Sequence, residues 1–344
     1  MQMKEVSLSN GWKKFNLWND HGIKVSVLNY GGIITEITVP DREGTMENIV
    51  LDYKDYRDYE NDTNFFGAII GRVAGRIQGA AFEIGGTVYR LEANDGPNHL
   101  HGASHGFHRV LWEAESFQSE DAIGIRLSHF SKDGDGGYPG NIEAAVTYRI
   151  TNENELIVEY EGKTDRTTLF TMTNHSYFNL SGNVKDPIHD HQVILDSHRF
   201  LELDEQLIPT GSVVDAFNTP FDFSQGQKLN EGIIADTKQN QVAGQGYDHY
   251  FLFDHTQQES VIAKHERNGR VLTIETDQPG MVLYTGNNLP SGLALAKGPS
   301  FKHAGVCFET QSSPASLHHE GLPGVILQPG ETYHQRTVFR FTTE

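Results

Sequence analysis

LIVEYE, residues 156–161, is the stretch of sequence that decides the fold. In it Leu156, Val158 and Tyr160 alternate with Ile157, Glu159 and Glu161. Successive side chains of a β-strand point to opposite faces of the sheet, so this alternation predicts a strand with one face in a core and the other partly in solvent. The same period of two recurs at Leu272–Glu275. Half-buried strands of this kind are typical of antiparallel sheets.

Similar runs occur along most of the chain. They are rich in Val, Ile, Thr, Tyr and Phe, and turn residues such as Asn268–Gly269 separate them. We expect a short helix within Tyr53–Asn64 and few helices elsewhere. Strands without alternating long helices predict an all-β fold, one large antiparallel β-sandwich with few short helices. The runs are Lys24–Leu28, Ile33–Val39, Ile123–His129, Ala144–Ile150, His249–Asp254, Met281–Thr285, Val306–Thr310 and Thr337–Thr342.

Linkers and repeats between the predicted strands would indicate more than one domain. No Pro/Ser-rich linker, repeat or low-complexity tract divides the chain. All-β units often run to roughly 250 residues or more as one domain. We therefore expect residues 1–344 to form a single domain.

Charge and cysteine content limit the partners and the compartment. The formal net charge is −19, which repels phosphate backbones and anionic lipid, so we expect neither nucleic acid nor membrane as a partner. Cys307 is the single cysteine and is predicted to be a small buried hydrophobe. Met1–Phe15 lacks the apolar region of a secretory signal, and no run reaches the roughly 20 apolar residues of a membrane span. These features predict a cytoplasmic protein.

The 17 histidines raise the possibility of a metal site. His99 and His101 would share one face of a strand, as in cupin metal sites, but the glutamate that a cupin carries about four residues later is missing. We therefore expect no metal, and keep a metal-dependent cupin-type enzyme as an alternative. The remaining paired histidines are predicted to be solvated loop residues: His189, His191, His318 and His319.

Several separated segments place polar residues of catalytic type among β-like apolar neighbours. In Gly305–Gln311, Cys307, Glu309 and Gln311 share one face of a strand, and Val306, Phe308 and Thr310 share the other. An ionised glutamate in mid-strand is costly unless its face opens to a polar cleft. The other segments are Asn98–Trp112, Thr173–Asn179 and Gly246–His249.

Together these segments resemble the galactose mutarotase (aldose 1-epimerase) family. The combination of Asn174-His175-Ser176-Tyr177-Phe178-Asn179 with Glu309-Thr310-Gln311 at this separation is highly specific. The resemblance implies a galactose mutarotase-like supersandwich with the sugar in an open cleft on one sheet. It runs in order through nearly the whole chain: Gly71–Ile77, His101, Gly137–Gly140, Thr173–Leu180, Asp248, Gln278–Gly280 and Glu309–Gln311.

The resemblance also assigns roles to single residues. Glu309 matches the family's general base, His175 its general acid, and His101 its second active-site histidine. Arg76, Asp248 and Gln278 match residues that contact the sugar. One departure is Gly75, because family members often carry Asn immediately before the arginine. We expect an aromatic side chain, Trp112 or Phe301, to stack on the apolar face of the sugar.

The implied activity is an aldose 1-epimerase, an isomerase that interconverts the α and β anomers of a free hexose such as galactose or glucose. Removing the O1 proton while protonating ring oxygen O5 requires only a base and an acid, so no cofactor is expected. A small-molecule sugar is the expected partner, and the chain is expected to be a monomer or homodimer. Two further alternatives remain: a hexose-6-phosphate 1-epimerase, which needs an extra cationic cluster, and a non-catalytic carbohydrate-binding β-sandwich, which needs no acid–base pair.

Overall fold

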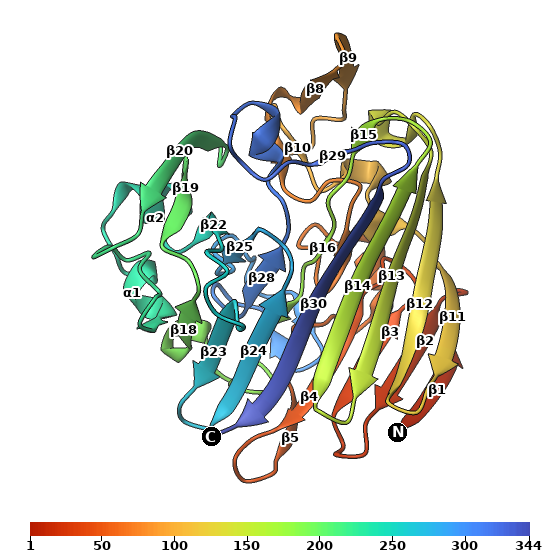
Figure 1. Cartoon of the computed structure of the whole chain (residues 1–344). Helices are drawn as coiled ribbons and strands as arrows, with labels where there is room; N and C mark the ends of the chain where they lie inside the picture. The colour runs from red at the N-terminus through yellow and green to blue at the C-terminus, as the bar shows by residue number, and fades with distance from the viewer.

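A nine-stranded antiparallel sheet forms the broadest layer of the computed structural model, which describes residues 1–344 (Figure 1). LIVEYE lies in β14 of this sheet, where Leu156, Val158 and Tyr160 are buried and Glu159 and Glu161 are partly exposed, as predicted. Ile157, on the same face as the two glutamates, is buried as well. The strand order is β11 (Glu113–Gln118), β12 (Ala122–Ser131), β13 (Ile142–Thr151), β14 (Glu155–Thr164), β30 (Thr332–Thr343), β24 (Arg270–Thr276), β23 (Val261–His265), β18 (Gln192–Leu195) and β21 (Gln227–Lys228).

Two further antiparallel sheets complete the sandwich. In Figure 1 the five-stranded sheet lies behind the β11–β14 part of the nine-stranded sheet. Its strands are β1 (Gln2–Ser7), β2 (Lys13–Trp18), β3 (Lys24–Leu28), β4 (Ile34–Pro40) and β5 (Met46–Asn48). The six-stranded sheet has the order β17 (Tyr177–Phe178), β28 (Val306–Thr310), β25 (Gly280–Tyr284), β22 (Asp248–Leu252), β19 (Arg199–Leu203) and β20 (Pro209–Asp215).

The core lies between these three sheets. A single cluster of 51 buried apolar residues includes Val25 from the five-stranded sheet, Ile125 and Tyr148 from the nine-stranded sheet, and Phe251 and Phe308 from the six-stranded sheet. Burial of this apolar surface is the main favourable contribution to folding. The all-β sandwich predicted from the period of two is confirmed.

The remaining elements are short. Tyr53–Asn64, where a short helix is predicted, contains the 3₁₀ helix η1 (Tyr56–Asn61). The other helices are α1 (Leu229–Ile233), α2 (Lys238–Val242), η2 (Gln78–Ala80), η3 (Ala103–His105), η4 (Phe107–Arg109), η5 (Asp135–Gly137), η6 (Ile188–Asp190) and η7 (Pro314–Leu317). None of them has the length and hydropathy for a membrane crossing.

Five two-stranded pairs are β6 (Ile69–Ile70) with β16 (Thr173–Asn174), β7 (Arg76–Ile77) with β10 (His99–Leu100), β8 (Ala81–Ile84) with β9 (Thr87–Arg90), β15 (Thr168–Leu169) with β29 (Ile326–Leu327), and β26 (Ala294–Leu295) with β27 (Gly298–Pro299).

The prediction for one loop histidine is wrong. His191 is buried, and its Nε2 accepts a hydrogen bond from the backbone N–H of Leu180 at 2.8 Å. Burial lowers the pKa of His191 to about 3, so the ring is neutral and serves as a structural acceptor. Its short His-x-His segment, His189 to His191, gives no sign of this partner, which lies 11 residues earlier in the chain.

The alternation along β28 positions the functional site. Phe308 belongs to the main core, and Thr310 contacts Thr337 of β30 at 2.8 Å between the hydroxyl oxygens. Glu309 therefore points to the opposite face of the six-stranded sheet, together with Gln311 just beyond the end of the strand. The two faces are those predicted from the sequence.

Candidate active site

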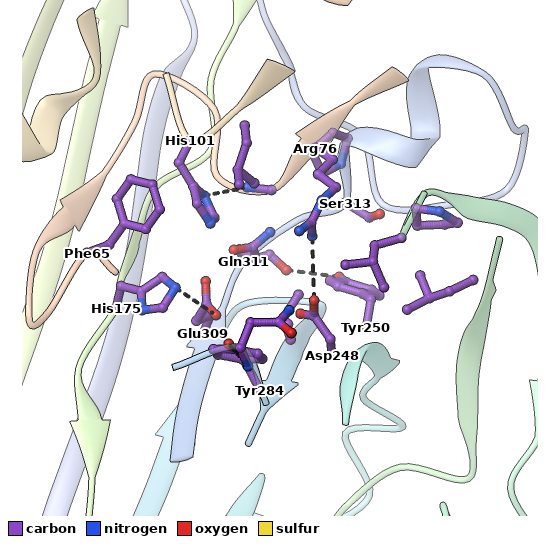
Figure 2. A pocket seen from close by; sticks show the side chains of 18 of the residues that line it. Phe65, Arg76, His101, His175, Asp248, Tyr250, Tyr284, Glu309, Gln311 and Ser313 are labelled. Carbon is purple, nitrogen blue, oxygen red and sulfur yellow. Dashed lines mark hydrogen bonds and ion pairs between the residues drawn. The ribbon is translucent and has the colours of Figure 1, made fainter. Parts of the chain in front are cut away.

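A cavity of about 310 Å³ opens on that face of the six-stranded sheet (Figure 2). Its size is that of a site for a small molecule. The cavity brings together five of the six predicted site residues, which come from separate parts of the chain: Arg76, His101, His175, Asp248 and Glu309.

Glu309 lies at the floor of the cavity on β28, where it pairs with Val282 of β25. Its side chain is only 4% exposed. Burial raises the pKa of this carboxyl well above its usual range; the negative charge of Asp248 adds to the rise and the guanidinium of Arg76 opposes it. The carboxyl group is thus able to hold a proton at a pH where an exposed glutamate has lost it.

His175 follows β16 and faces Glu309 across the cavity. Its Nε2 lies 3.5 Å from Oε1 of Glu309 (Figure 2). Its Nδ1 lies 3.5 Å from Sγ of Cys307. Burial lowers the pKa of His175 to about 4. Burial also raises the pKa of the Cys307 thiol well above its ordinary value, which makes this thiol a poor nucleophile.

His101 enters the cavity from the loop after β10. Its backbone has φ of 55°, so the chain turns here and His99 points elsewhere, with Nδ1 near the Glu92 carbonyl and Nε2 near the Tyr138 hydroxyl. The expected pairing of His99 and His101 on one strand face is wrong for this reason. Nδ1 of His101 accepts the backbone N–H of Gly75 at 3.1 Å, so a neutral ring carries its hydrogen on Nε2. Burial, with added repulsion from His175 and Arg76, holds the pKa of His101 well below its usual value.

Arg76 and Asp248 form a charged pair farther along the cavity. Nη1 of Arg76 lies 3.6 Å from Oδ2 of Asp248, and its Nε donates to Oδ2 of Asp95 at 2.7 Å. Burial raises the pKa of Asp248 to about 6; Arg76 opposes the rise and Asp95 adds to it. The guanidinium offers donors and the carboxylate offers acceptors, which is the complement that vicinal hydroxyl groups require.

Other expectations do not fit the cavity. Gln278 is buried outside it, where its Nε2 donates to the Tyr333 hydroxyl at 3.1 Å, so the structure does not bring Gln278 to the predicted sugar site. Trp112 packs in the main core, and Phe301 lies against another buried cluster; neither lines the cavity.

The glutamine that does line the cavity is Gln311, two residues after Glu309 on the same face. Its Nε2 donates to the carbonyl of Ala74 at 3.3 Å, and its Oε1 is buried without a partner. The aromatic walls are Phe65, Tyr177, Tyr250 and Tyr284. Gln311 and Tyr177 lie within the quoted motifs, whereas Phe65 has only a local signal, an Asp-x-Asn turn pattern before it.

Gly75, where relatives often carry Asn, has φ of +90°, a region that glycine occupies without strain. A Cβ at this position would lie 3.2 Å from Nε2 of Gln311 and 3.2 Å from Cγ of Pro314. A larger residue here therefore requires a small shift of those two neighbours. The glycine also donates the hydrogen bond that fixes the ring of His101.

One group of side chains has the composition of a metal site. The ligand atoms of His101, His175 and Glu309 lie within 4.8 Å of one another, and two imidazoles with a carboxylate suit several divalent metals. The hydrogen bond from Gly75 to Nδ1 of His101 leaves the hydrogen on Nε2, and a protonated nitrogen cannot be a ligand. The group is therefore better suited to proton transfer than to metal binding.

Three comparisons with known proteins all match nearly the whole chain to sugar epimerases. The family model described as aldose 1-epimerase matches residues 13–340. Galactose mutarotase from Sus scrofa is 37% identical over 333 residues, which covers 96% of this chain and 94% of the relative. Maltose epimerase from Levilactobacillus brevis is 32% identical, with 96% and 94% covered. Among solved structures, galactose 1-epimerase from Lactobacillus acidophilus superposes with a TM-score of 0.88 at 28% identity, covering 99% of both chains.

Proposed function

We propose that Glu309 and His175 are the acid–base pair of this chain, which belongs to the aldose 1-epimerase family. Its activity is that of a mutarotase, an isomerase. Free hexoses are the proposed substrates, with galactose first among them because the mammalian relatives are named galactose mutarotases. The proposed reaction needs no cofactor or metal, since both reacting groups are side chains.

The carboxylate of Glu309 removes the proton of the anomeric hydroxyl O1, and the imidazolium of His175 gives a proton to ring oxygen O5. The C1–O5 bond breaks and an open-chain aldehyde forms. Rotation about C1–C2 presents the other face of the aldehyde, and the two proton transfers then run in reverse to close the ring. General acid–base catalysis of this kind contributes about 10²–10⁴-fold for a well-placed group.

The other cavity residues bind and orient the sugar in this proposal. The Nε2–H of His101 donates a hydrogen bond to a sugar oxygen, and the ring stays neutral because burial disfavours its charged form. Arg76 and Asp248 hold hydroxyl groups at a distance from C1. Gln311, whose side chain lines the cavity, replaces Gln278 as the proposed amide contact.

One observation carries the assignment: the carboxyl of Glu309 and the imidazole of His175 face each other at 3.5 Å in a cavity, with pKa values displaced in opposite directions. Titratable pairs whose environments push their pKa values apart are typical of acid–base sites. A carbohydrate-binding module has no use for such a pair.

A phosphorylated hexose is a less suitable substrate. The cavity contains a single guanidinium, that of Arg76, and Asp95 and Asp248 already pair with it. A phosphate group requires additional cations or donors. The net charge of −19 also supports our proposal that neither nucleic acid nor an anionic membrane is a partner. We further propose a cytoplasmic protein with one domain over residues 1–344, acting as a monomer or homodimer.

Polarimetry tests the proposed function. Freshly dissolved α-galactose, α-glucose and α-xylose are followed with and without protein, and the spontaneous rate is subtracted. We expect acceleration for at least one free hexose, and none for glucose 6-phosphate. Acceleration of glucose 6-phosphate alone contradicts the proposed substrate class, and binding without acceleration supports the carbohydrate-binding alternative.

A further inference from the structure

Phe65 is an aromatic residue in an unusual backbone conformation beside the proposed acid–base pair. Its φ is 60°, in the left-handed region that bulky side chains rarely occupy. It lies in the loop between η1 and β6 and lines the cavity (Figure 2). A conformation of this kind persists only where the surrounding structure enforces it, and such positions cluster at functional sites.

Asp62 enforces the conformation. Its buried carboxylate accepts the backbone N–H of Asn64 and that of Phe66, both at 2.8 Å, so one side chain closes the turn around Phe65. The same carboxylate accepts the hydroxyl of Tyr53 at 2.8 Å. With these partners the carboxylate is satisfied inside the protein, and the turn is fixed from within.

The loop is also bonded directly to the segment that carries His175. The backbone N–H of Gly67 donates to the carbonyl of His175 at 3.0 Å, and the N–H of His175 donates to the carbonyl of Ala68 at 2.9 Å. In addition, the amide of Asn174 donates to the carbonyl of Gly67 at 2.8 Å. The position of the Phe65 ring relative to His175 is therefore set by backbone hydrogen bonds on both sides.

The ring of Phe65 contacts three imidazoles. Its centroid lies 4.8 Å from that of His101 and 4.9 Å from that of His108, both edge-to-face, and 5.7 Å from that of His175 in a tilted arrangement. Two of these three rings are the histidines of the proposed site. Aromatic contacts of this geometry stabilise one orientation of each ring relative to the other.

We propose that Phe65, held by Asp62, is a positioning residue for His101 and His175: its ring fixes the orientation of both imidazoles and excludes water from the side of the cavity where they lie. The inference rests on the proposed roles of Glu309 and His175. It gives a physical reason for an aromatic residue at a left-handed position where Gly or Asn is favoured.

Water exclusion has an electrostatic consequence that can be measured. Burial is the largest cause of the lowered pKa of His175, so removing the Phe65 ring is expected to raise that pKa toward the ordinary value of histidine. The groups facing His175 that also titrate or carry charge are Glu309 and Cys307 on β28, His101, His108, Tyr177 and Tyr284, with Arg76 and Asp248 farther along the cavity. All of them are unchanged in the Phe65, Asp62 and Phe301 variants below.

Phe65→Gly removes the ring and keeps the backbone conformation, because glycine adopts φ near +60° without strain. The variant therefore tests the ring alone. In steady-state polarimetry with galactose, we expect kcat to fall by roughly 10-fold or more, with a smaller change in KM, because the imidazoles lose their fixed orientation. Below the pKa of His175 the pair holds a second proton and turnover stops, so this pKa sets the acid limb of the kcat profile. That limb is expected to move upward by about one pH unit in Phe65→Gly. Phe65→Tyr, which keeps the ring, is expected to retain kcat within about threefold and the original acid limb.

Phe301→Ala is the matched control. Phe301 packs on the same buried cluster as Phe65 but does not line the cavity. The Phe301→Ala protein is expected to lose stability without a change in kcat or in the pH dependence of kcat. If Phe65→Gly folds poorly, Asp62→Asn provides the second test, because it weakens the turn and leaves the ring in place; an intermediate fall in kcat is then expected.

The outcomes separate this inference from the proposed function. A Phe65→Gly protein with unchanged kcat and an unchanged acid limb overturns the positioning role. If Glu309→Gln also leaves the rate unchanged, the proposed acid–base pair is wrong as well. If Glu309→Gln abolishes the rate while Phe65→Gly is normal, the pair stands and only the role of Phe65 is refuted.

Discussion

Glu309→Gln changes one buried oxygen for an amide nitrogen and leaves the shape of the cavity intact. Glu309 is 3% exposed, and its Oε1 lies 3.5 Å from Nε2 of His175. The substituted amide can still hydrogen-bond the anomeric hydroxyl, but it cannot accept its proton. Substrate binding should therefore survive while ring opening is lost.

The magnitude follows from the burial of the site. A general base contributes about 10²–10⁴-fold, or about 2.7–5.4 kcal/mol of activation free energy. Because the side chain is screened from solvent, neither water nor buffer can readily replace it, and we expect the upper half of that range. A fall in kcat of roughly 10³–10⁴-fold is therefore predicted, with KM within about threefold.

The same substitution should stabilise the protein at neutral pH. Burial raises the folded-state pKa of Glu309, so the folded carboxyl keeps its proton at a pH where the unfolded chain has released it. Proton release by the unfolded chain lowers the free energy of unfolding once the pH exceeds the unfolded-state pKa of about 4.3. The loss grows by about 1.4 kcal/mol for each pH unit up to the folded-state pKa of Glu309 and is complete above it. Glutamine has no proton to release. The stability gain of Glu309→Gln should vanish below pH 4.

The assay combines polarimetry with thermal unfolding across a range of pH. His175→Asn should lower kcat by a similar factor, and the double variant should be little worse than the poorer single variant, because the two groups act in one proton relay. Fully additive losses would show that the two groups act independently. A folded Glu309→Gln protein with a rate within about twofold of wild type would remove the base from the proposed reaction.

The other predictions concern binding, pH and metal. Arg76→Ala should raise KM about 10-fold or more while the protein stays folded, and a KM equal to that of wild type would contradict the binding role. Arg72→Ala should instead lower stability, because Arg72 is buried and donates to the Gly140 carbonyl at 2.9 Å and to the Lys132 carbonyl at 2.6 Å. KM should rise as pH falls through about 6, where Asp248 takes up a proton and loses its charge, and this dependence should be absent in Asp248→Asn, whose KM is already high. Exhaustive chelation should leave kcat unchanged, and restoration of a lost rate by Zn²⁺ or Mn²⁺ would show that the group His101, His175 and Glu309 binds metal during turnover.

The fold was predictable where its signal is local. The alternation in LIVEYE identifies β14, and the alternation along Val306–Thr310 assigns Glu309 and Phe308 to opposite faces, both as found. The order of strands has no such signal. β30 inserts between β14 and β24, and Glu155 pairs with Arg340, 185 residues later. Such pairing depends on packing across the whole sheet and leaves no pattern in either strand alone.

The motifs predicted five of the side chains that line the cavity, and the departures from the predicted arrangement have local causes. Gln278 lies in a motif, but two residues before β25 its side chain turns toward Tyr333. His99 and His101 diverge because positive φ at His101 ends the strand alternation. Phe65 was missed because its place in the cavity depends on a turn closed by Asp62 and on backbone bonds to His175, more than 100 residues later.

The opposite displacements of the two pKa values have one common cause and one consequence. Burial disfavours the charge of Glu309 and the charge of His175 alike, so it raises the first pKa and lowers the second. Between the two displaced values the pair holds a single proton, which is the number that the proposed reaction requires. Opening a hemiacetal ring removes one proton from O1 and adds one to O5, so the proton count of the pair is the same before and after. Without substrate, the arrangement with a neutral acid and a neutral imidazole is the one that burial favours, and this is also the state left when the ring has opened. The environment therefore stabilises the enzyme form that accompanies the open-chain aldehyde, and ring closure to either anomer starts from that same form.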